Sequence, residues 1–507
     1  MGKKSQNKPQ VKNVGHNQTK PNQGPASTKK TICNKLSPQK RNEVNQLVDK
    51  LLKVSTAVHS TTASSAKDWE THLEIEKILN KINVIESELK LPLPNRTQGS
   101  QEALLTWLEN NSAEVNGVGI QEFHGQGQGL VALRDVSEGE MMVAVPRRLM
   151  ITVETIQSSK LGYLLANETM LKHMPNVALA LFLLLERFCK DTLSFWAPYI
   201  EMLPSTYTTV LYFSAQDLQE LKGSPTLESA LKQCRNIARQ YAYFHKLFEN
   251  MGDPASEILR DVFTYEQYRW AVSTVMTRQN FIPSADGSCM VNALIPLWDM
   301  ANHSNGKIST DYSLGTDRSE CLAWRDFNAG EQVYIFYGAR SNADLLVHNG
   351  FVYPDNLHDS FRVRLGVAKS DPLATERGRV LARLALPTAA DFVLLRGPQP
   401  VEGQLLAFLR VFSMQQEHLE HWAESDKVSD LTYTDCSLDT QVETKAWNFL
   451  MARIKLLQSL YPTSLQDDLK IVTEDMLECR RLAIQLRIAE KSILQSALEY
   501  IELRDKP

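Results

Sequence analysis

Three polar residues fall within five positions directly after an apolar segment of the chain. Asp299, Asn302 and His303 follow the run Leu294-Ile295-Pro296-Leu297-Trp298. An Asp299/His303 pair could act as general acid and base, but a capped turn with a hydrogen-bonded core histidine fits this cluster equally well. No second group of His, Cys or carboxylate residues with ligand spacing accompanies it, so the sequence does not support a metal site.

A glycine-rich segment lies earlier in the chain. Gly127-Gln128-Gly129-Leu130-Val131-Ala132 fits the GxGxxA pattern of dinucleotide-binding proteins, which requires a helix directly after it. Short strands and the turn Ser137-Glu138-Gly139 follow here instead, so we reject a Rossmann fold. The glycines can let the backbone approach a ligand closely, or they can belong to a plain hairpin.

A third segment, residues 330–338, ends in Tyr337-Gly338. Alone it predicts only an aromatic strand with a glycine stop. Together and in this order, the three segments resemble the SET-domain protein methyltransferases, over roughly residues 116–338. The chain departs from the histone-type pattern because it lacks a cysteine-rich segment after the domain.

The helical insert and the helical C-terminal region resemble the Rubisco-methyltransferase branch of SET proteins. Within that branch, the actin-histidine N-methyltransferases are the most similar in four further segments, residues 239–244, 268–273, 275–280 and 335–343. Gln126 and Gln128 depart from the family's glycine segment, so the resemblance carries over only backbone contacts there. It implies transfer of a methyl group from S-adenosyl-L-methionine to the distal (tele) nitrogen of a histidine in actin.

The same resemblance implies a cofactor site without a metal. In that site Arg278 faces the cofactor carboxylate, which suits a guanidinium, and Phe351 covers the adenine. Surface exposure of Arg96 and core packing of Phe351 are the structural alternatives. The implied cofactor-binding residues are Arg96, Gln126, Gly127, Gln128, Arg278, Asp299, Met300, Ala301, Asn302, His303, Asn349, Gly350 and Phe351.

A histidine nucleophile makes a specific chemical demand. An imidazole with a pKa of about 6.5 is mostly neutral at pH 7, whereas a lysine amine with a pKa of about 10.4 is not. Its two nitrogens differ, so the tautomer must be fixed. A side-chain amide oxygen that accepts one N–H leaves the other lone pair free. Composition alone favours a role for Asn280 in capping or ending the preceding helix, but the resemblance implies that Asn280 is the residue that orients the substrate.

Tyr337 is, by resemblance, the tyrosine near the transferred methyl group. Its hydroxyl would align the methyl through weak C–H···O contacts, because a phenol with a pKa of about 10 is a poor base at pH 7. For the peptide groove, aromatic residues and arginine are typical of binding hot spots. Core packing explains Trp298 equally well. The predicted substrate-binding residues are Gln279, Trp298, Tyr312 and Arg340.

Two other functions are consistent with these motifs. A lysine methyltransferase of the same branch would favour an apolar or aromatic wall at position 280. An inactive SET-derived module that only binds actin or chromatin would not bind the cofactor.

The elements that must position these residues predict an α+β fold. Short strands are expected in residues 117–150 and 290–353, and helices elsewhere. We predict a helical lead-in (42–115), a SET domain (116–338) with a helical insert at about 151–280, and a mainly helical substrate-binding region (339–507). We expect the fold of this last region to be that of an all-α domain.

The composition indicates a protein of a reducing compartment, cytoplasmic or nuclear. The 507 residues carry a net charge of −4, and their seven cysteines are scattered singly. No apolar run approaches the length of a membrane span. Residues 1–41 hold ten basic and no acidic residues. We predict a disordered solvating tail there, with nuclear import or nucleic-acid binding as the alternative; nucleic acid is not expected to bind elsewhere.

Overall fold

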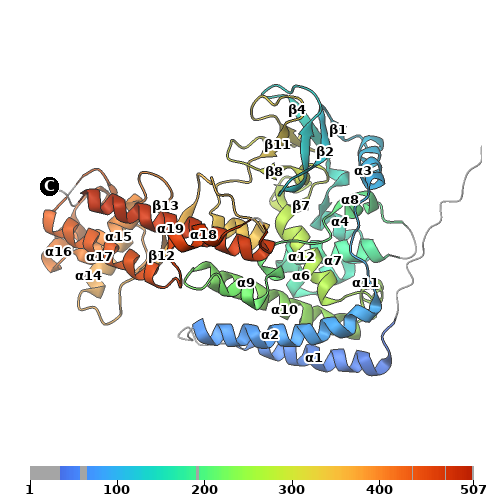
Figure 1. Ribbon diagram of the computed structural model, residues 1–507, viewed down its shortest axis with the longest axis horizontal. Helices are drawn as coiled ribbons and strands as arrows, with labels where there is room; N and C mark the ends of the chain where they lie inside the picture. Colours follow the sequence, from blue (N-terminus) through green and yellow to red (C-terminus); the bar gives the residue numbers. More distant parts are fainter. Residues whose placement is uncertain (1–34, 58–64, 190–192, 437, 474, 505–507) are drawn as a thin grey trace, which may run out of the picture.

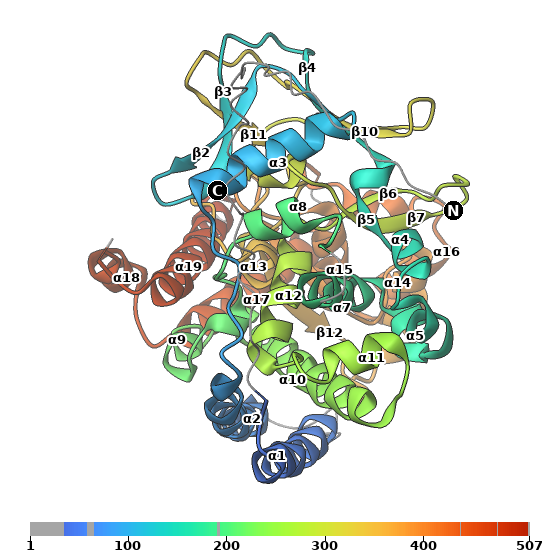
Figure 2. The ribbon, with the colours of Figure 1, turned by 90° about the vertical axis from the view of Figure 1, so that its right-hand side faces the viewer.

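The computed structural model describes residues 35–57, 65–189, 193–436, 438–473 and 475–504. The strands of the SET region lie at one end, and the C-terminal helices extend to the other (Figure 1). Turned by 90°, the strands lie above the insert helices, with α1 and α2 beneath them (Figure 2). No helix in the described ranges is long and apolar enough to span a membrane.

The helical lead-in begins earlier than predicted. Ser37 caps α1 by accepting a hydrogen bond from the Lys40 amide, and Pro38 occupies the first turn. Arg41 forms an ion pair with Glu249 at 2.7 Å. The prediction of disorder up to residue 41 is therefore wrong for residues 38–41, whereas residues 1–34 lie outside the described part of the chain. The lead-in comprises α1 (Pro38–Thr56), α2 (Ser65–Glu86), the 3-10 helix η1 (Ser87–Leu89) and α3 (Gln98–Asn110).

Three small sheets form the SET region, and each joins strands that are distant in sequence. The order β1-β4-β10-β9 makes the first, β2-β3-β11-β8 the second and β5-β7-β6 the third. The strands are β1 (Glu114–Val115), β2 (Val118–Phe123), β3 (Gly127–Ala132), β4 (Met141–Pro146), β5 (Ile151–Thr152), β6 (Asn280–Pro283), β7 (Met290–Leu294), β8 (Asn302–His303), β9 (Thr310–Ser313), β10 (Arg318–Leu322) and β11 (Gln332–Ile335).

The helical insert lies between β5 and β6. Its apolar helix α7 is buried throughout Val177–Leu185 and packs against α12, whose last residue, Arg278, leads into β6. Thr264 caps the start of α12. The insert helices are α4 (Val153–Gln157), α5 (Gly162–Asn167), α6 (Thr169–His173), α7 (Pro175–Phe188), α8 (Ala197–Met202), η3 (Val210–Tyr212), α9 (Ala215–Gln219), α10 (Thr226–Asn250), α11 (Pro254–Leu259) and α12 (Tyr265–Arg278).

The C-terminal region is mainly helical, but it is not entirely so. β12 (Ser360–Gly366) and β13 (Ala389–Leu395) form an antiparallel pair, and the residues of β12 alternate between buried and less buried positions. The expectation of an all-α domain therefore missed this pair. The other elements are α13 (Asn342–Asp344), the π-helix η5 (Leu345–Asn349), α14 (Ala374–Arg383), α15 (Gly403–Ser413), α16 (Gln416–Glu424), η6 (Val428–Thr432), α17 (Thr440–Ser459), α18 (Leu465–Ile471) and α19 (Glu478–Arg504).

The last helix attaches the C-terminal region to the insert through a buried carboxylate. Glu490 of α19 accepts hydrogen bonds from Ser224 at 2.7 Å, Thr226 at 3.0 Å and Tyr461 at 2.7 Å. Ser224 and Thr226 lie at the start of α10. The side chain therefore joins elements that are more than 260 positions apart in the chain.

This carboxylate should make stability depend on pH near neutrality. Burial raises the pKa of Glu490 from its ordinary value of 4.5 to about 7, although hydrogen bonds from Tyr461, Ser224 and Thr226 oppose the rise. Because the folded state holds the proton more tightly, the stabilisation present below pH 4.5 is lost as the pH rises through 7. Between pH 6 and pH 8, we expect the wild type to lose about 1 kcal/mol more unfolding free energy than Glu490→Gln. Urea unfolding of both proteins at both pH values measures this, and equal losses would contradict it.

Candidate active site

Two segments that are distant in sequence meet at β8 and β11. The strands pair in parallel, with Asn302 opposite Tyr334 and His303 opposite Ile335. Just beyond β11, the backbone N–H of Tyr337 donates to His303 Nδ1 at 3.2 Å. Burial lowers the pKa of His303 to about 4, with smaller contributions from Arg340 and His358. The imidazole is therefore neutral at pH 7, and its Nδ1 lone pair can accept this bond.

The Tyr337 hydroxyl is fixed by the segment before β8. It donates to the Ala301 carbonyl at 2.7 Å. Burial raises the pKa of Tyr337 to about 12. The phenol is therefore protonated at pH 7. Its oxygen can accept weak contacts through its lone pairs, but it cannot act as an effective base. This arrangement suits alignment of a reacting group and not proton removal.

Arg278, at the end of α12, lies against the 3-10 helix η4 (Trp298–Met300). Its Nη1 donates to the Asp299 carbonyl at 2.7 Å and lies 3.4 Å from Asp299 Oδ1. Tyr199 donates to the same carboxylate at 2.5 Å. Burial, and to a smaller extent the charge of Arg278, lower the pKa of Arg96 to about 10. Arg96 therefore belongs to the same charged cluster, where its Nε donates to Met202 O at 2.6 Å.

Several buried polar atoms at this site have no partner within the described residues. They are Arg278 Nε, Gln128 Oε1 and Gln332 Nε2. Because unpaired buried polar atoms are costly, they indicate that the site is built for a polar ligand. Asn302 Nδ2 lies 3.5 Å from the Gln128 carbonyl, which places β8 beside the glycine segment. A guanidinium donor beside amide donors and acceptors fits a ligand with an amino-acid carboxylate and a polar ring.

Gly129 allows this close approach of β3 to β8 and β11. A Cβ atom there would lie 2.7 Å from Gln332 Nε2 and 2.8 Å from Asn302 Nδ2. We expect Gly129→Ala to displace both amides and to weaken cofactor binding about tenfold, with little loss of folding stability, since both neighbours are side-chain ends. Calorimetric titration measures the affinity. Gly315→Ala is the control, because nothing lies within 4 Å of a Cβ there. Equal affinities of the two variants would refute this role of Gly129.

Asn280 begins β6, separated by one residue from the end of the helix that carries Arg278. Its Nδ2 donates to the Arg278 carbonyl at 3.1 Å. Its Oδ1 makes no hydrogen bond to any described residue and is not buried. The orientation of the amide therefore leaves an acceptor oxygen available, although the contact to Arg278 also resembles the helix-ending alternative.

Residues 349–351 lie close in space both to the His303 and Tyr337 rings and to the insert. The Phe351 ring lies 6.0 Å from the His303 ring and 6.3 Å from the Tyr337 ring. Gly350 has a φ of 80°, and a Cβ there would lie 2.8 Å from the backbone of Thr208, so only glycine fits. Arg340 donates to Asn349 Oδ1 at 3.0 Å and is exposed.

Other predicted site residues are less directly connected to this cluster. Tyr312 donates to Asp317 at 2.6 Å and lies under Arg147. Trp298 is only 7% exposed, which fits the core-packing alternative. Gln126 and Gly127 are exposed at the turn of the β2–β3 hairpin. Met300 is buried in the core. The roles of all these residues remain predictions.

Sequence reasoning missed some residues that shape the site. Tyr199 and Thr208 lie in segments whose patterns predicted only structure, and Gln332 lies within the third motif segment but was not singled out there. The glycine at position 350 is a sequence signal that another backbone segment could approach closely there, and in the structure that segment contains Thr208. The described residues contain no cluster of three or more His, Cys, Asp or Glu side chains that could hold a metal ion.

Comparisons with known proteins define the class first. A family model described as SET domain matches residues 127–338, and one described as Rubisco LSMT substrate-binding matches residues 368–494. The fold is similar to a crystal structure of the SET domain of LSMT bound to lysine and AdoHcy (TM-score 0.65, 23% identity, 81% of this chain and 92% of that one). A structure of Rubisco LSMT bound to AdoMet is similar too (TM-score 0.64, 23% identity, 80% and 92%). The chain is thus a SET-domain protein with a Rubisco LSMT-type C-terminal domain, which confirms the predicted fold class.

Curated relatives narrow this class to one family. The actin-histidine N-methyltransferase of Gallus gallus is 42% identical over 445 residues, which cover 87% of this chain and 75% of the relative. The protein of that name from Homo sapiens is 40% identical over 504 residues, covering 98% and 81%. The chain belongs to the actin-histidine N-methyltransferase family. The resemblance predicted from the ordered motifs is confirmed, and the chain is an enzyme of the SET methyltransferase class.

Proposed function

We propose that this protein transfers a methyl group from S-adenosyl-L-methionine to the distal nitrogen of a histidine in actin. The observation that carries the proposal is the free acceptor oxygen of Asn280, in an enzyme whose curated relatives are named for this reaction. We further propose a cytoplasmic location, with the nucleus as a second one, because scattered single cysteines favour a reducing compartment.

The cofactor, when bound, supplies an electrophilic methyl group on a sulfonium; the sulfur–methyl bond would break and the sulfur would leave as the neutral thioether of S-adenosylhomocysteine. Arg278 would bind its carboxylate through the buried Nε, and Arg96 would add a second positive charge nearby. Asn302, Gln128 and Gln332 would contact its polar groups.

The histidine substrate would be oriented by Asn280. Its Oδ1 accepts the N–H of the proximal ring nitrogen, which leaves the lone pair of the distal nitrogen free to attack. No strong base is required for attack because the neutral imidazole already dominates at pH 7. Tyr337 holds its hydroxyl oxygen beside the Ala301 carbonyl, where both oxygens can contact a methyl group. The proton on the product imidazolium can leave to water.

The alignment role of Tyr337 gives a direct test of this mechanism. Tyr337→Phe removes the hydroxyl but keeps the ring, so we expect histidine methylation to slow by roughly 10²-fold. Calorimetry should show S-adenosyl-L-methionine binding within about threefold of the wild type. If the variant methylates as fast as the wild type, this mechanism is wrong. If the wild type does not bind the cofactor at all, the result favours the alternative of an inactive SET-derived binding module.

A further inference from the structure

A buried amide lies next to the residues that precede Asn280. Asn292 in β7 is 7% exposed, and its Nδ2 donates to Gln279 Oε1 at 2.8 Å. In the β6–β7 pair, Asn292 lies opposite Phe281, and Asn280 lies opposite Ala293. The bond therefore ties the last residue before β6 to the neighbouring strand.

In this bond the Oε1 end of the Gln279 amide faces Asn292. Because Oε1 accepts from Asn292, the Nε2 group points away from it, and Nε2 makes no hydrogen bond to a described residue and is not buried. At Asn280 the situation is reversed, since Nδ2 is used internally and Oδ1 is free. Gln279 thus leaves a donor available, and Asn280, the next residue along the chain, leaves an acceptor available.

A peptide segment that carries a histidine has matching groups. The imidazole N–H is a donor, and each flanking peptide carbonyl is a strong acceptor. We propose that Asn292 is a positioning residue that turns Gln279 so that its Nε2 donates to a main-chain carbonyl of the protein substrate beside the target histidine. This inference rests on the proposed function and extends it to the recognition of the substrate backbone.

The decisive variant reverses the polarity of the buried partner. Asn292→Asp introduces a carboxylate, which can only accept. The Gln279 amide must then turn its Nε2 toward position 292 and present Oε1 to the substrate carbonyl. We expect the KM for the protein substrate to rise about tenfold, whereas kcat at saturating substrate and the affinity for S-adenosyl-L-methionine change by less than about threefold.

Two further variants separate orientation from simple structural damage. Asn292→Leu removes the donor without reversing it, so the amide samples both orientations and the KM should rise only about twofold. Gln279→Glu keeps Asn292 and presents an oxygen to the substrate from a side chain that is only half-buried. It should raise the KM as much as Asn292→Asp, and it tests the proposal even if the buried substitution prevents folding.

The outcomes distinguish this inference from the proposed function. A wild type that methylates no histidine refutes both. A wild type that methylates histidine, with Asn292→Asp and Gln279→Glu at the wild-type KM, refutes only the positioning role. A loss that is larger for Asn292→Leu than for Asn292→Asp also overturns it, since a merely structural asparagine would give that order.

Discussion

Replacing Asn280 by alanine should reduce histidine methylation by about 10²-fold in kcat/KM while leaving the affinity for S-adenosyl-L-methionine unchanged. The variant removes the free Oδ1 that fixes the substrate tautomer. The loss of one oriented polar group at a reacting centre typically costs about 10²–10³-fold. Initial rates with purified protein substrate, together with a calorimetric cofactor titration, measure the two quantities separately.

A distant asparagine supplies the control for this variant. Asn116 is solvent-exposed, and its Nδ2 lies 3.3 Å from the Met141 carbonyl. Asn116→Ala should retain the wild-type rate. Wild-type turnover by Asn280→Ala would disprove the orienting role, and a parallel loss of cofactor binding would point instead to the helix-ending role.

Replacing Asp468 by asparagine should destabilise the attachment of the last helix by about 3–5 kcal/mol. Asp468 has no exposed side-chain surface. It accepts two bonds from Arg487, at 2.8 and 2.6 Å, and one from Lys491 at 2.5 Å. Without the carboxylate charge, two cations remain buried without their main partner.

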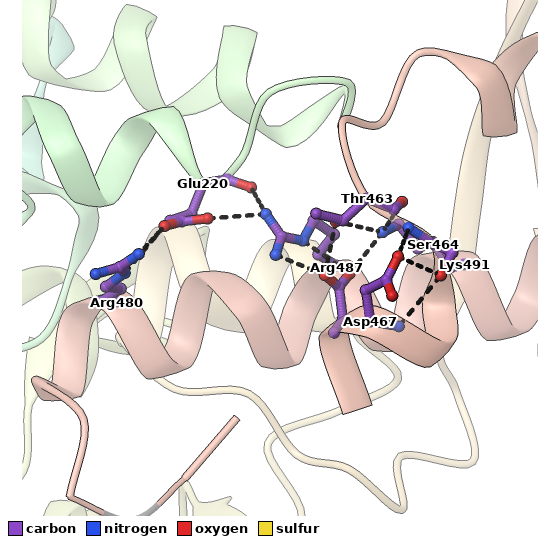
Figure 3. Close-up of polar contacts among 8 residues, drawn as sticks. Glu220, Thr463, Ser464, Asp467, Arg480, Arg487 and Lys491 are labelled. Carbon is purple, nitrogen blue, oxygen red and sulfur yellow. Dashed lines mark hydrogen bonds and ion pairs between the residues drawn. The ribbon is translucent and has the colours of Figure 1, made fainter. Parts of the chain in front are cut away.

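The same guanidinium reaches the insert, as Figure 3 shows. Arg487 also donates to the carbonyl of Glu220 at 3.0 Å and to its carboxylate at 2.9 Å, so the network joins α19 to the segment after α9. Burial alone would raise the pKa of Asp468, but the bonds from Arg487 and Lys491 hold it below its usual value of 3.8. This stabilisation is therefore present above about pH 4, and it is lost as the pH falls through the lowered pKa.

The neighbouring aspartate makes a matched control. Asp467 is exposed and bonds to Ser464 at the start of α18 (Figure 3). Asp467→Asn should cost no more than about 1 kcal/mol. Urea unfolding and hydrogen exchange of α19 compare the two variants. Similar stability of Asp468→Asn and Asp467→Asn would show that the buried network contributes little.

Much of the fold and part of the site follow from local patterns. Helical spacing of apolar residues predicted the lead-in helices, the insert and α19. The ordered motifs predicted a SET domain, and in the structure the parallel pairing of β8 and β11 brings the segments that end at His303 and Tyr337 together. These predictions succeeded because each depends on residues that are close in sequence or on a motif order specific to one fold.

The features that were missed depend on contacts between distant residues. Asn292 and Tyr199 act through hydrogen bonds across elements, which no local pattern reveals. The β12–β13 pair was hidden in a region where the long helices dominate the pattern. The end of the basic tail was misplaced because charge and composition outweighed the cap at Ser37 and the apolar face of α1.

The most direct test of the central claim is a methyl-transfer experiment with unmethylated actin. The purified protein is incubated with actin and isotopically labelled S-adenosyl-L-methionine, and the modified residue is mapped by mass spectrometry. We predict a single labelled methyl group on the distal nitrogen of one histidine, absent with Tyr337→Phe or Asn280→Ala at equal times. Label on lysine, or no label with cofactor bound, would contradict the claim.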